Sequence, residues 1–188
     1  KGFRHMIGKS PQENKSMPAF DGNEWLGSFK RLAERSMTFD LQLTSEQYED
    51  VLNTLLQVPE LTVVLCHFAS PWDQSEKGFK DWQQAMKRFA LLPNMHIKLS
   101  GFSMFTHAFN PQQFLKYSHA AIDIFGSQRC MLGSNFPVDK LHMSFEELTS
   151  AWKRLLSRMK ILVNIEHQER ARLVLSISVP IFNPCSLT

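Results

Sequence analysis

Five short segments of the chain carry the hydrophobic pattern of a β-strand, and a stretch with helical periodicity follows each of them. The predicted strands are Gly2–Ile7, Met37–Leu43, Leu61–His67, His96–Gly101 and Cys130–Asn135. Their first residues lie 24 to 35 positions apart in the sequence, a spacing typical of parallel strands joined by crossover helices and not of hairpins. The run VVLC inside the third segment is continuously apolar, as expected of a strand that is buried on both faces.

Start and stop signals bound the predicted helices. Ser or Thr followed by Glu or Gln three positions later forms a capping box, and Asn-Pro and Gly mark a helix start and a helix end. The predicted helices are Asn23–Arg35, one from near Thr44 with Gln47 as its box partner, Phe79–Leu91, one between Asn110 and Gly126, one from Ser144 (partner Glu147) to about Met159, and Glu166–Leu175.

Alternating strands and helices leave two architectures, an open doubly wound sheet and a (β/α)8 barrel. Neither GxGxxG nor GxxxxGK[ST] follows any strand, which disfavours a doubly wound nucleotide-binding sheet. Polar residues at the ends of several strands are typical of barrel enzymes. We therefore predict an α/β fold of the (β/α)8 TIM type with only the last five βα units present. Residues 1–175 form this partial barrel domain, and residues 176–188 form an irregular tail.

Composition narrows the class of protein. The 188 residues include 21 basic and 18 acidic side chains, a net charge of 21 − 18 = +3, with 43% hydrophobic and 21% charged residues. This balance excludes a disordered chain, a membrane span and a strongly basic nucleic-acid-binding surface. Three cysteines without CxxC spacing favour a reducing compartment, so we expect a cytoplasmic protein. The expected partner is a small-molecule substrate, with no nucleic acid or membrane; a homo-oligomer remains open.

Candidate chemistry lies at the strand ends and in the loops that follow them. Two long polar loops, Lys9–Gly22 and Ser70–Gly78, are predicted binding loops because they follow carboxyl ends of strands. The strand-end residues considered for the site are Arg4, His5, Gln42, His67, Lys98, Ser100 and Asn135.

The sequence leaves more than one role open for several of these residues. His67 suits a general base, an oxyanion-stabilising cation or a metal ligand, and equally a half-buried histidine bonded to a carbonyl. Arg4 and Lys98 suit an oxygen-rich substrate, and equally a structural ion pair with Asp40. The seven histidines form neither HxH nor HExxH. Cys66 is adjacent to His67, so strand alternation disfavours a catalytic pair.

Several of these segments together resemble a known family. GFRH, DLQL, VVLCH followed by a proline loop, NMHIKLSGF and FGSQRCMLGSNFPVD resemble segments of amidohydrolase-related (amidohydrolase 2) proteins. Within that family they are most similar to the metal-optional lactonases, which include sugar-lactone hydrolases and 2-pyrone-4,6-dicarboxylate lactonase. The resemblance runs from about Gly2 to Met159, and its most specific parts are KLSG and FG..RC.LGSNFPV. The end of the chain, Ser176–Thr188, departs from the family's usual ending.

The resemblance implies a (β/α)8 barrel whose first strand carries a D-x-H-x-H motif. With GSNFPV as the eighth strand, GFRH is roughly the fourth, so the chain is a C-terminal fragment without the first three strands and their histidine pair. His67 then matches a sixth-strand histidine that binds or activates the reacting carbonyl, and Arg4 a substrate-contacting region. Asn135 stands where many members have the Asp that deprotonates the hydrolytic water.

The implied function is a hydrolase that opens a lactone of a sugar acid or carboxylated pyrone by water attack. The catalytic residues would be His67, whose pKa can lie near neutrality, and Asn135. The substrate-binding residues would be Arg4, His5, Gln42, Lys98 and Ser100. The resemblance makes no cofactor certain and leaves open one divalent metal ion, zinc, in the full-length protein. The alternative function is a catalytically inactive fragment or pseudoenzyme that binds a ligand or partner.

Overall fold

A single parallel sheet organises the chain. The computed structural model describes residues 2–7 and 20–163. All five predicted strands are confirmed, with ends within three residues of the expected ones: β1 (Gly2–Met6), β2 (Thr38–Gln42), β3 (Thr62–Leu65), β4 (Met95–Leu99) and β5 (Cys130–Leu132). Every neighbouring pair is parallel, and the strand order across the sheet, β1-β2-β3-β4-β5, is the order along the chain.

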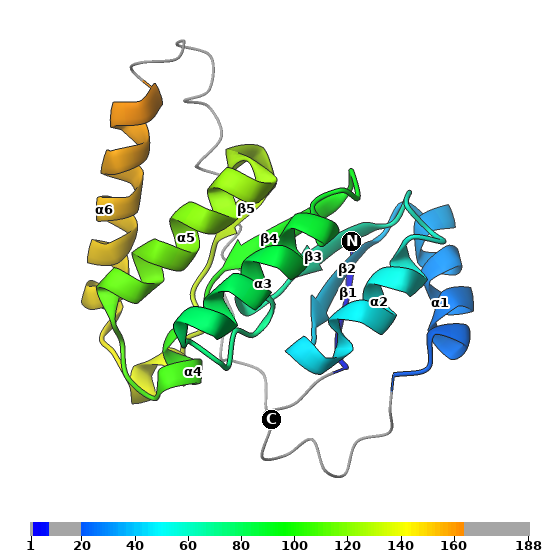
Figure 1. The fold of residues 1–188 in the computed structure, drawn as a ribbon, viewed down its shortest axis with the longest axis horizontal. Helices are drawn as coiled ribbons and strands as arrows, with labels where there is room; N and C mark the ends of the chain where they lie inside the picture. Colours follow the sequence, from blue (N-terminus) through cyan, green and yellow to red (C-terminus); the bar gives the residue numbers. More distant parts are fainter. Residues whose placement is uncertain (1, 8–19, 164–188) are drawn as a thin grey trace, which may run out of the picture.

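This unbroken strand order decides between the two expected architectures. A doubly wound sheet reverses its strand order at a switch point, whereas successive right-handed crossovers in one direction place all connecting helices on one face. The helices contact one another in chain order along that face, α1 with α2, α2 with α3, α3 with α5 and α5 with α6 (Figure 1). Their bounds are α1 (Gly22–Glu34), α2 (Tyr48–Leu55), α3 (Glu76–Phe89), α5 (Pro111–Phe125) and α6 (Phe145–Val163). The fold is therefore α/β, with the layout of part of a (β/α)8 barrel.

The helix starts follow the capping chemistry read from the sequence. The Asn110 side chain accepts hydrogen bonds from the backbone of Gln112 and Gln113, at 3.0 and 3.2 Å, directly before α5. The Thr44–Gln47 box is present and opens a 3₁₀ turn, η2 (Ser45–Gln47), that continues into α2. The Ser144–Glu147 box opens α6.

Two helix bounds differ from the prediction by three residues or more. Helix α3 begins three residues early because the Ser75 hydroxyl accepts the Gly78 N–H at 3.0 Å, so the predicted loop Ser70–Gly78 is shorter. Helix α6 continues to Val163 instead of ending near Met159.

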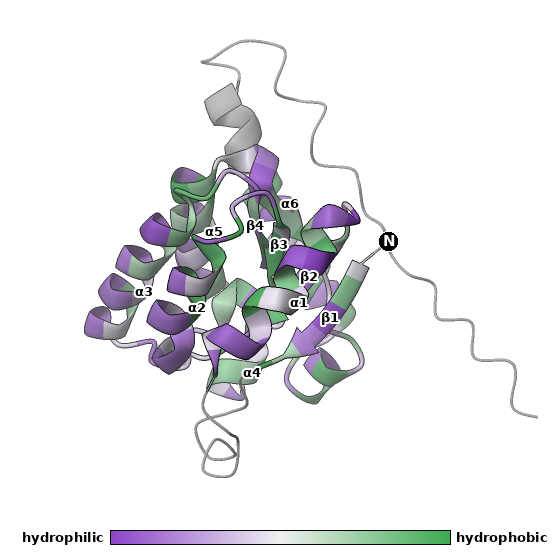
Figure 2. Ribbon diagram, turned by 90° about the vertical axis from the view of Figure 1, so that its right-hand side faces the viewer, coloured by the Kyte–Doolittle hydropathy of each residue, from purple (hydrophilic) through white to green (hydrophobic). Residues whose placement is uncertain are grey.

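The two faces of the sheet differ in character. On β4, Met95, Ile97 and Leu99 are buried under the helices, while the alternate residues His96 and Lys98 are only partly buried on the other face. The same alternation on β2 buries Phe39 and Leu41 and leaves Asp40 partly exposed. Figure 2 shows the central strands mostly in hydrophobic green and the outward surfaces of α2 and α3 mostly in hydrophilic purple. We call the face away from the helices the inner face, since in a closed barrel it lines the interior.

Some of the expected features fall outside the described residues. These are most of the loop Lys9–Gly22, the helix Glu166–Leu175 and the tail 176–188, so the proposed domain boundary at residue 175 stays a prediction. The α4 turn (Ser103–Thr106) follows β4, and no helix within residues 2–7 and 20–163 is long and apolar enough to cross a bilayer.

The outer edges of β1 and β5 generate a prediction about the chain as printed. Among the described residues nothing pairs with these edges, and Phe3 and Met6 on β1 are 57% and 52% exposed. Unpaired apolar edges act as templates for intermolecular strand pairing. We expect the isolated chain to self-associate, and Phe3→Lys with Met6→Lys to shift it towards monomer in light scattering. Leu91→Lys, at an 80% exposed position away from both edges, is the matched control. A monodisperse wild-type monomer that unfolds sharply would contradict the expectation.

Candidate active site

An ion-paired cluster occupies the inner face of the sheet. Arg4 on β1 lies directly across from Asp40 on β2 in the strand register, and its Nη2 and Nε atoms donate to Asp40 Oδ2 at 2.6 and 3.1 Å. This hydrogen bond raises the pKa of Arg4, so the guanidinium is charged at any working pH. The structural pairing considered for Arg4 from the sequence is therefore present.

Lys98 approaches the same carboxylate from the other side. Its Nζ atom lies 3.7 Å from Asp40 Oδ2, an ion pair beyond hydrogen-bonding distance, and its side chain is 23% exposed. Gly133 on the segment after β5 leaves room for the Lys98 stem, because a Cβ there would lie only 3.3 Å from Lys98 Cγ and Cδ. Two cations facing one carboxylate give the cluster a net charge of about +1.

A left-handed turn at the end of β3 places His67. Four consecutive residues, His67–Ser70, have φ between 51° and 59°. For non-glycine residues this conformation costs roughly 1–2 kcal/mol each, so surrounding contacts must hold it. The Trp82 indole donates to the Phe68 carbonyl at 2.7 Å, and the Tyr48 hydroxyl donates to the Ala69 carbonyl. The Phe68 ring is fully buried against Phe102 and Phe114.

His67 is buried and bonded to Ser100. Its Nδ1 atom lies 2.9 Å from Ser100 Oγ, and the two residues are 9% and 1% exposed. Burial, followed by the positive charges of Lys98 and Arg4, lowers the pKa of His67 to about 4. The expectation of a pKa near neutrality is therefore corrected: the imidazole is neutral at pH 7, because its charged form is disfavoured by desolvation and by two cations.

Asn135 belongs to a second hydrogen-bonded group, formed by the loops after β4 and β5. Its side-chain amide contacts the Met104 sulfur, and its backbone N–H donates to Asp139 Oδ2 at 2.9 Å. Asp139 is fully buried, and its Oδ1 accepts the Ser103 hydroxyl at 2.8 Å. The prediction did not include Asp139 or Ser103. The only sequence signal was the acidic residue directly after the NFPV segment, in a position with no amphipathic pattern to assign it a face.

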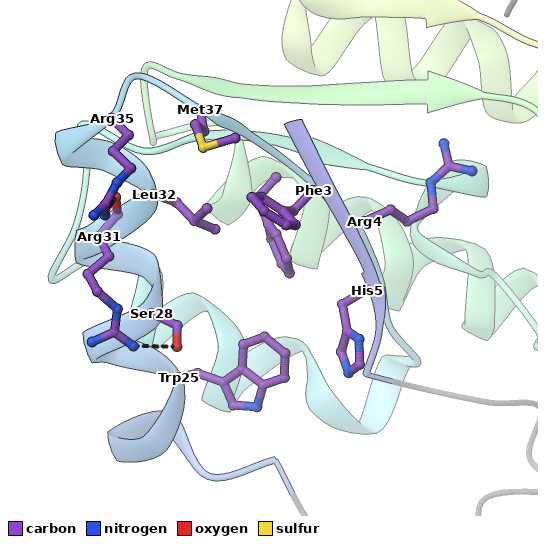
Figure 3. A pocket seen from close by; sticks show the side chains of 10 residues that line it. Phe3, Arg4, His5, Trp25, Ser28, Arg31, Leu32, Arg35 and Met37 are labelled. Carbon is purple, nitrogen blue, oxygen red and sulfur yellow. Dashed lines mark hydrogen bonds between the residues drawn. The ribbon is translucent and has the colours of Figure 1, made fainter. Parts of the chain in front are cut away.

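The structure separates His5 from the cluster. Adjacent strand residues point to opposite faces, so His5 lies on the helix side of β1, with its ring 5.0 Å from that of Trp25. Figure 3 shows His5 and Trp25 at an open groove while the Arg4 side chain extends away from Trp25. This groove, of about 620 Å³, lies between β1 and α1 and contains neither His67 nor Lys98. Gln42 shares the alternation of Asp40 and so lies on the inner face, next to β1 in the register.

The cluster therefore combines Arg4 and Asp40, in the middle of β1 and β2, with Lys98 and the His67–Ser100 pair at the carboxyl ends of β3 and β4. It offers an ammonium group, a neutral imidazole and a paired guanidinium, which suit binding and polarising an oxygen-rich ligand. Cys66 adds no thiolate, because burial and then the charge of Asp40 raise the pKa of its thiol. Within the described part of the chain, no three His, Cys, Asp or Glu side chains converge as metal ligands.

A barrel-type sheet with polar groups at its carboxyl edge is the arrangement that barrel enzymes use for their sites. The comparison with known families identifies the class: residues 1–174 match the family model described as amidohydrolase, and the chain belongs to that family. It is 36% identical over 132 residues to the uncharacterised protein y4mH of Sinorhizobium fredii, covering 70% of this chain and 44% of that protein. It is 27% identical over 165 residues to L-fucono-1,5-lactonase of Burkholderia multivorans, covering 82% of this chain and 54% of that enzyme.

Solved structures support the same fold. An amidohydrolase from Burkholderia multivorans with bound zinc superposes with a TM-score of 0.72 at 24% identity, covering 84% of this chain and 57% of that one. A putative 2-pyrone-4,6-dicarboxylic acid hydrolase from Pseudomonas putida gives a TM-score of 0.58 at 19% identity, covering 82% and 55%. At these identities the likeness concerns the fold. The chain spans about half the length of the relatives it matches.

The lowered pKa of His67 predicts how stability depends on pH. Between its ordinary value of 6.5 and about 4, the unfolded state binds the proton that the folded state excludes. The contribution of His67 to the free energy of unfolding therefore falls as the pH decreases through that window. Above the window this contribution is constant. We expect a loss of about 2 kcal/mol between pH 7 and pH 5, measured by urea unfolding. His67→Asn should remove this part of the dependence, and an unchanged slope in that variant would contradict the assignment.

Proposed function

We propose that the protein is a hydrolase that opens the lactone of a sugar acid or of a carboxylated pyrone by water attack. Membership of the amidohydrolase family and the likeness to a protein named L-fucono-1,5-lactonase support the reaction class. The observation that carries the proposal is the position of Lys98, a partly buried ammonium beside a neutral histidine on the inner face.

Lys98 is the group proposed to stabilise the oxyanion. Water attack on a lactone carbonyl places negative charge on the carbonyl oxygen, and a nearby positive charge in a poorly solvated site stabilises it. His67 is neutral, and Arg4 uses two donors on Asp40. Lys98 Nζ lies 3.7 Å from Asp40 Oδ2, beyond hydrogen-bonding distance, so its ammonium protons are available to a ligand in this proposal.

His67 is the proposed base. An amide at Asn135 cannot take a proton, and both carboxylate oxygens of Asp139 already accept hydrogen bonds. The neutral imidazole has one nitrogen with a free lone pair. In the proposed step, the attacking water gives a proton to that nitrogen, the ester C–O bond of the ring breaks, and the proton passes to the departing alkoxide oxygen.

The charge balance of the cluster favours an anionic substrate. Asp40 neutralises one of the two cations, which leaves a net positive charge of about one. The Arg4 guanidinium has five N–H donors and directs some of them away from Asp40, a pattern suited to a carboxylate. The proposed substrates therefore carry a carboxylate or several oxygens in addition to the lactone.

A bound zinc ion is suggested only by the similarity to the Burkholderia multivorans structure that contains zinc. The described residues of this chain do not assemble a zinc site, so they do not fit that ion by themselves, and the steps above use none.

The second candidate function is a ligand-binding protein without turnover. It is favoured by Asn135, which holds its loop through Met104 and Asp139 instead of presenting a carboxylate.

Two variants test these roles in the longest form of the protein that its transcript encodes. We expect His67→Ala to lower lactonase activity by on the order of 10²-fold or more, because it removes the general base. Asn135→Asp should be tolerated or raise activity, since it restores the acid common in the family. The assay uses a panel of sugar lactones and pyrone dicarboxylates across pH.

The opposite pattern would overturn the assigned roles: activity abolished by Asn135→Asp and intact in His67→Ala. Saturable binding of these lactones by the wild-type protein with no turnover of any of them would support the second candidate function. His119→Ala, on α5 and away from the cluster, is the matched control for loss of an imidazole.

A further inference from the structure

Ser100 contacts His67 and is almost completely buried. Its hydroxyl lies 2.9 Å from His67 Nδ1, and only 1% of the residue is exposed. A serine that bound substrate directly would need an accessible hydroxyl. Here the imidazole lies against the hydroxyl, a position that suits a role acting through His67.

The contact at Nδ1 leaves Nε2 as the ring nitrogen available to a reactant. For Nε2 to accept a proton, as the proposed base role requires, the proton of the neutral ring must lie on Nδ1. Ser100 Oγ, 2.9 Å from Nδ1, is placed to accept that hydrogen. A hydrogen bond with Ser100 also raises the pKa of His67 against the effect of burial.

The backbone around the pair leaves the ring little freedom. Gly101 has φ +63°, and a Cβ at that position would lie 2.6 Å from His67 Nδ1. On the other side, the left-handed turn His67–Ser70 is held by Trp82 and Tyr48. The ring is therefore fixed both by its own backbone and by the segment that carries Ser100.

From this geometry we infer that Ser100 is a positioning residue that holds the proton of His67 on Nδ1, so that the Nε2 lone pair faces the reaction. The inference rests on the proposed function for its catalytic consequence. Its structural content, the tautomer of His67, is independent of any activity. When one ring nitrogen of a histidine donates a hydrogen bond to an oxygen, the ring is held in a fixed orientation. The other ring nitrogen is then a more basic proton acceptor.

Nitrogen NMR of the imidazole-labelled protein at pH 7 tests the tautomer, with His67→Asn to assign the signals. We expect Nδ1 protonated and Nε2 unprotonated in the wild-type protein. In Ser100→Ala, the Nδ1-protonated fraction should fall, and kcat for lactone hydrolysis should fall by roughly 10- to 100-fold with KM little changed. Ser100→Thr, which keeps the hydroxyl, should restore the wild-type tautomer. Ser118→Ala removes another buried hydroxyl, one without a partner among the described residues, and should change neither quantity.

Each result decides between roles. Protonation of Nε2 in the wild-type protein would overturn the inference. So would a Ser100→Ala variant with the wild-type tautomer and kcat and a raised KM, because that pattern belongs to a substrate contact. Absence of turnover in the wild-type protein would refute the proposed function alone, since the NMR measurement would still decide the tautomer.

Discussion

The Asp40 carboxylate is the interaction on which the charge pattern of the inner face depends. It lies between Arg4 on one neighbouring strand and Lys98 two strands away. Without it, the exposed Arg4 and the partly buried Lys98 would repel each other across the inner face. With it, Arg4 is held by two hydrogen bonds and Lys98 is left with free donors. Burial, followed by the charges of the same two cations, keeps His67 neutral.

The motifs that identify the family have a physical reading in this structure. In KLSG, Lys98 contributes the ammonium, Ser100 bonds the imidazole, and Gly101 lies so close to the His67 ring that a side chain would displace it. In LGSN, Gly133 makes space for the stem of Lys98. The left-handed turn after β3 completes the arrangement, because its cost is offset by buried donors on α2 and α3. The motif residues thus serve mainly to place two side chains, Lys98 and His67.

Strands and helices were predictable to within a few residues because periodicity and caps are local properties of the sequence. The site was predictable only in part. Alternation along β1 already implies that Arg4 and His5 point to opposite faces of the sheet. That rule alone separates His5 from an inner-face site that contains Arg4. The low pKa of His67 and the burial of Asp139 depend on loops that are distant in sequence and meet only in the folded structure. The left-handed turn also depends on tertiary contacts, because residues other than glycine adopt that conformation only when surrounding groups hold it.

The measurement that tests the account most directly is the effect of Lys98→Met on lactone hydrolysis in the longest form of the protein that its transcript encodes. If Lys98 stabilises the oxyanion, kcat should fall by on the order of 10²- to 10³-fold. Lys98→Arg should retain part of the activity, and Lys87→Met, at an exposed position on α3, should retain all of it. Wild-type turnover in Lys98→Met would contradict the account.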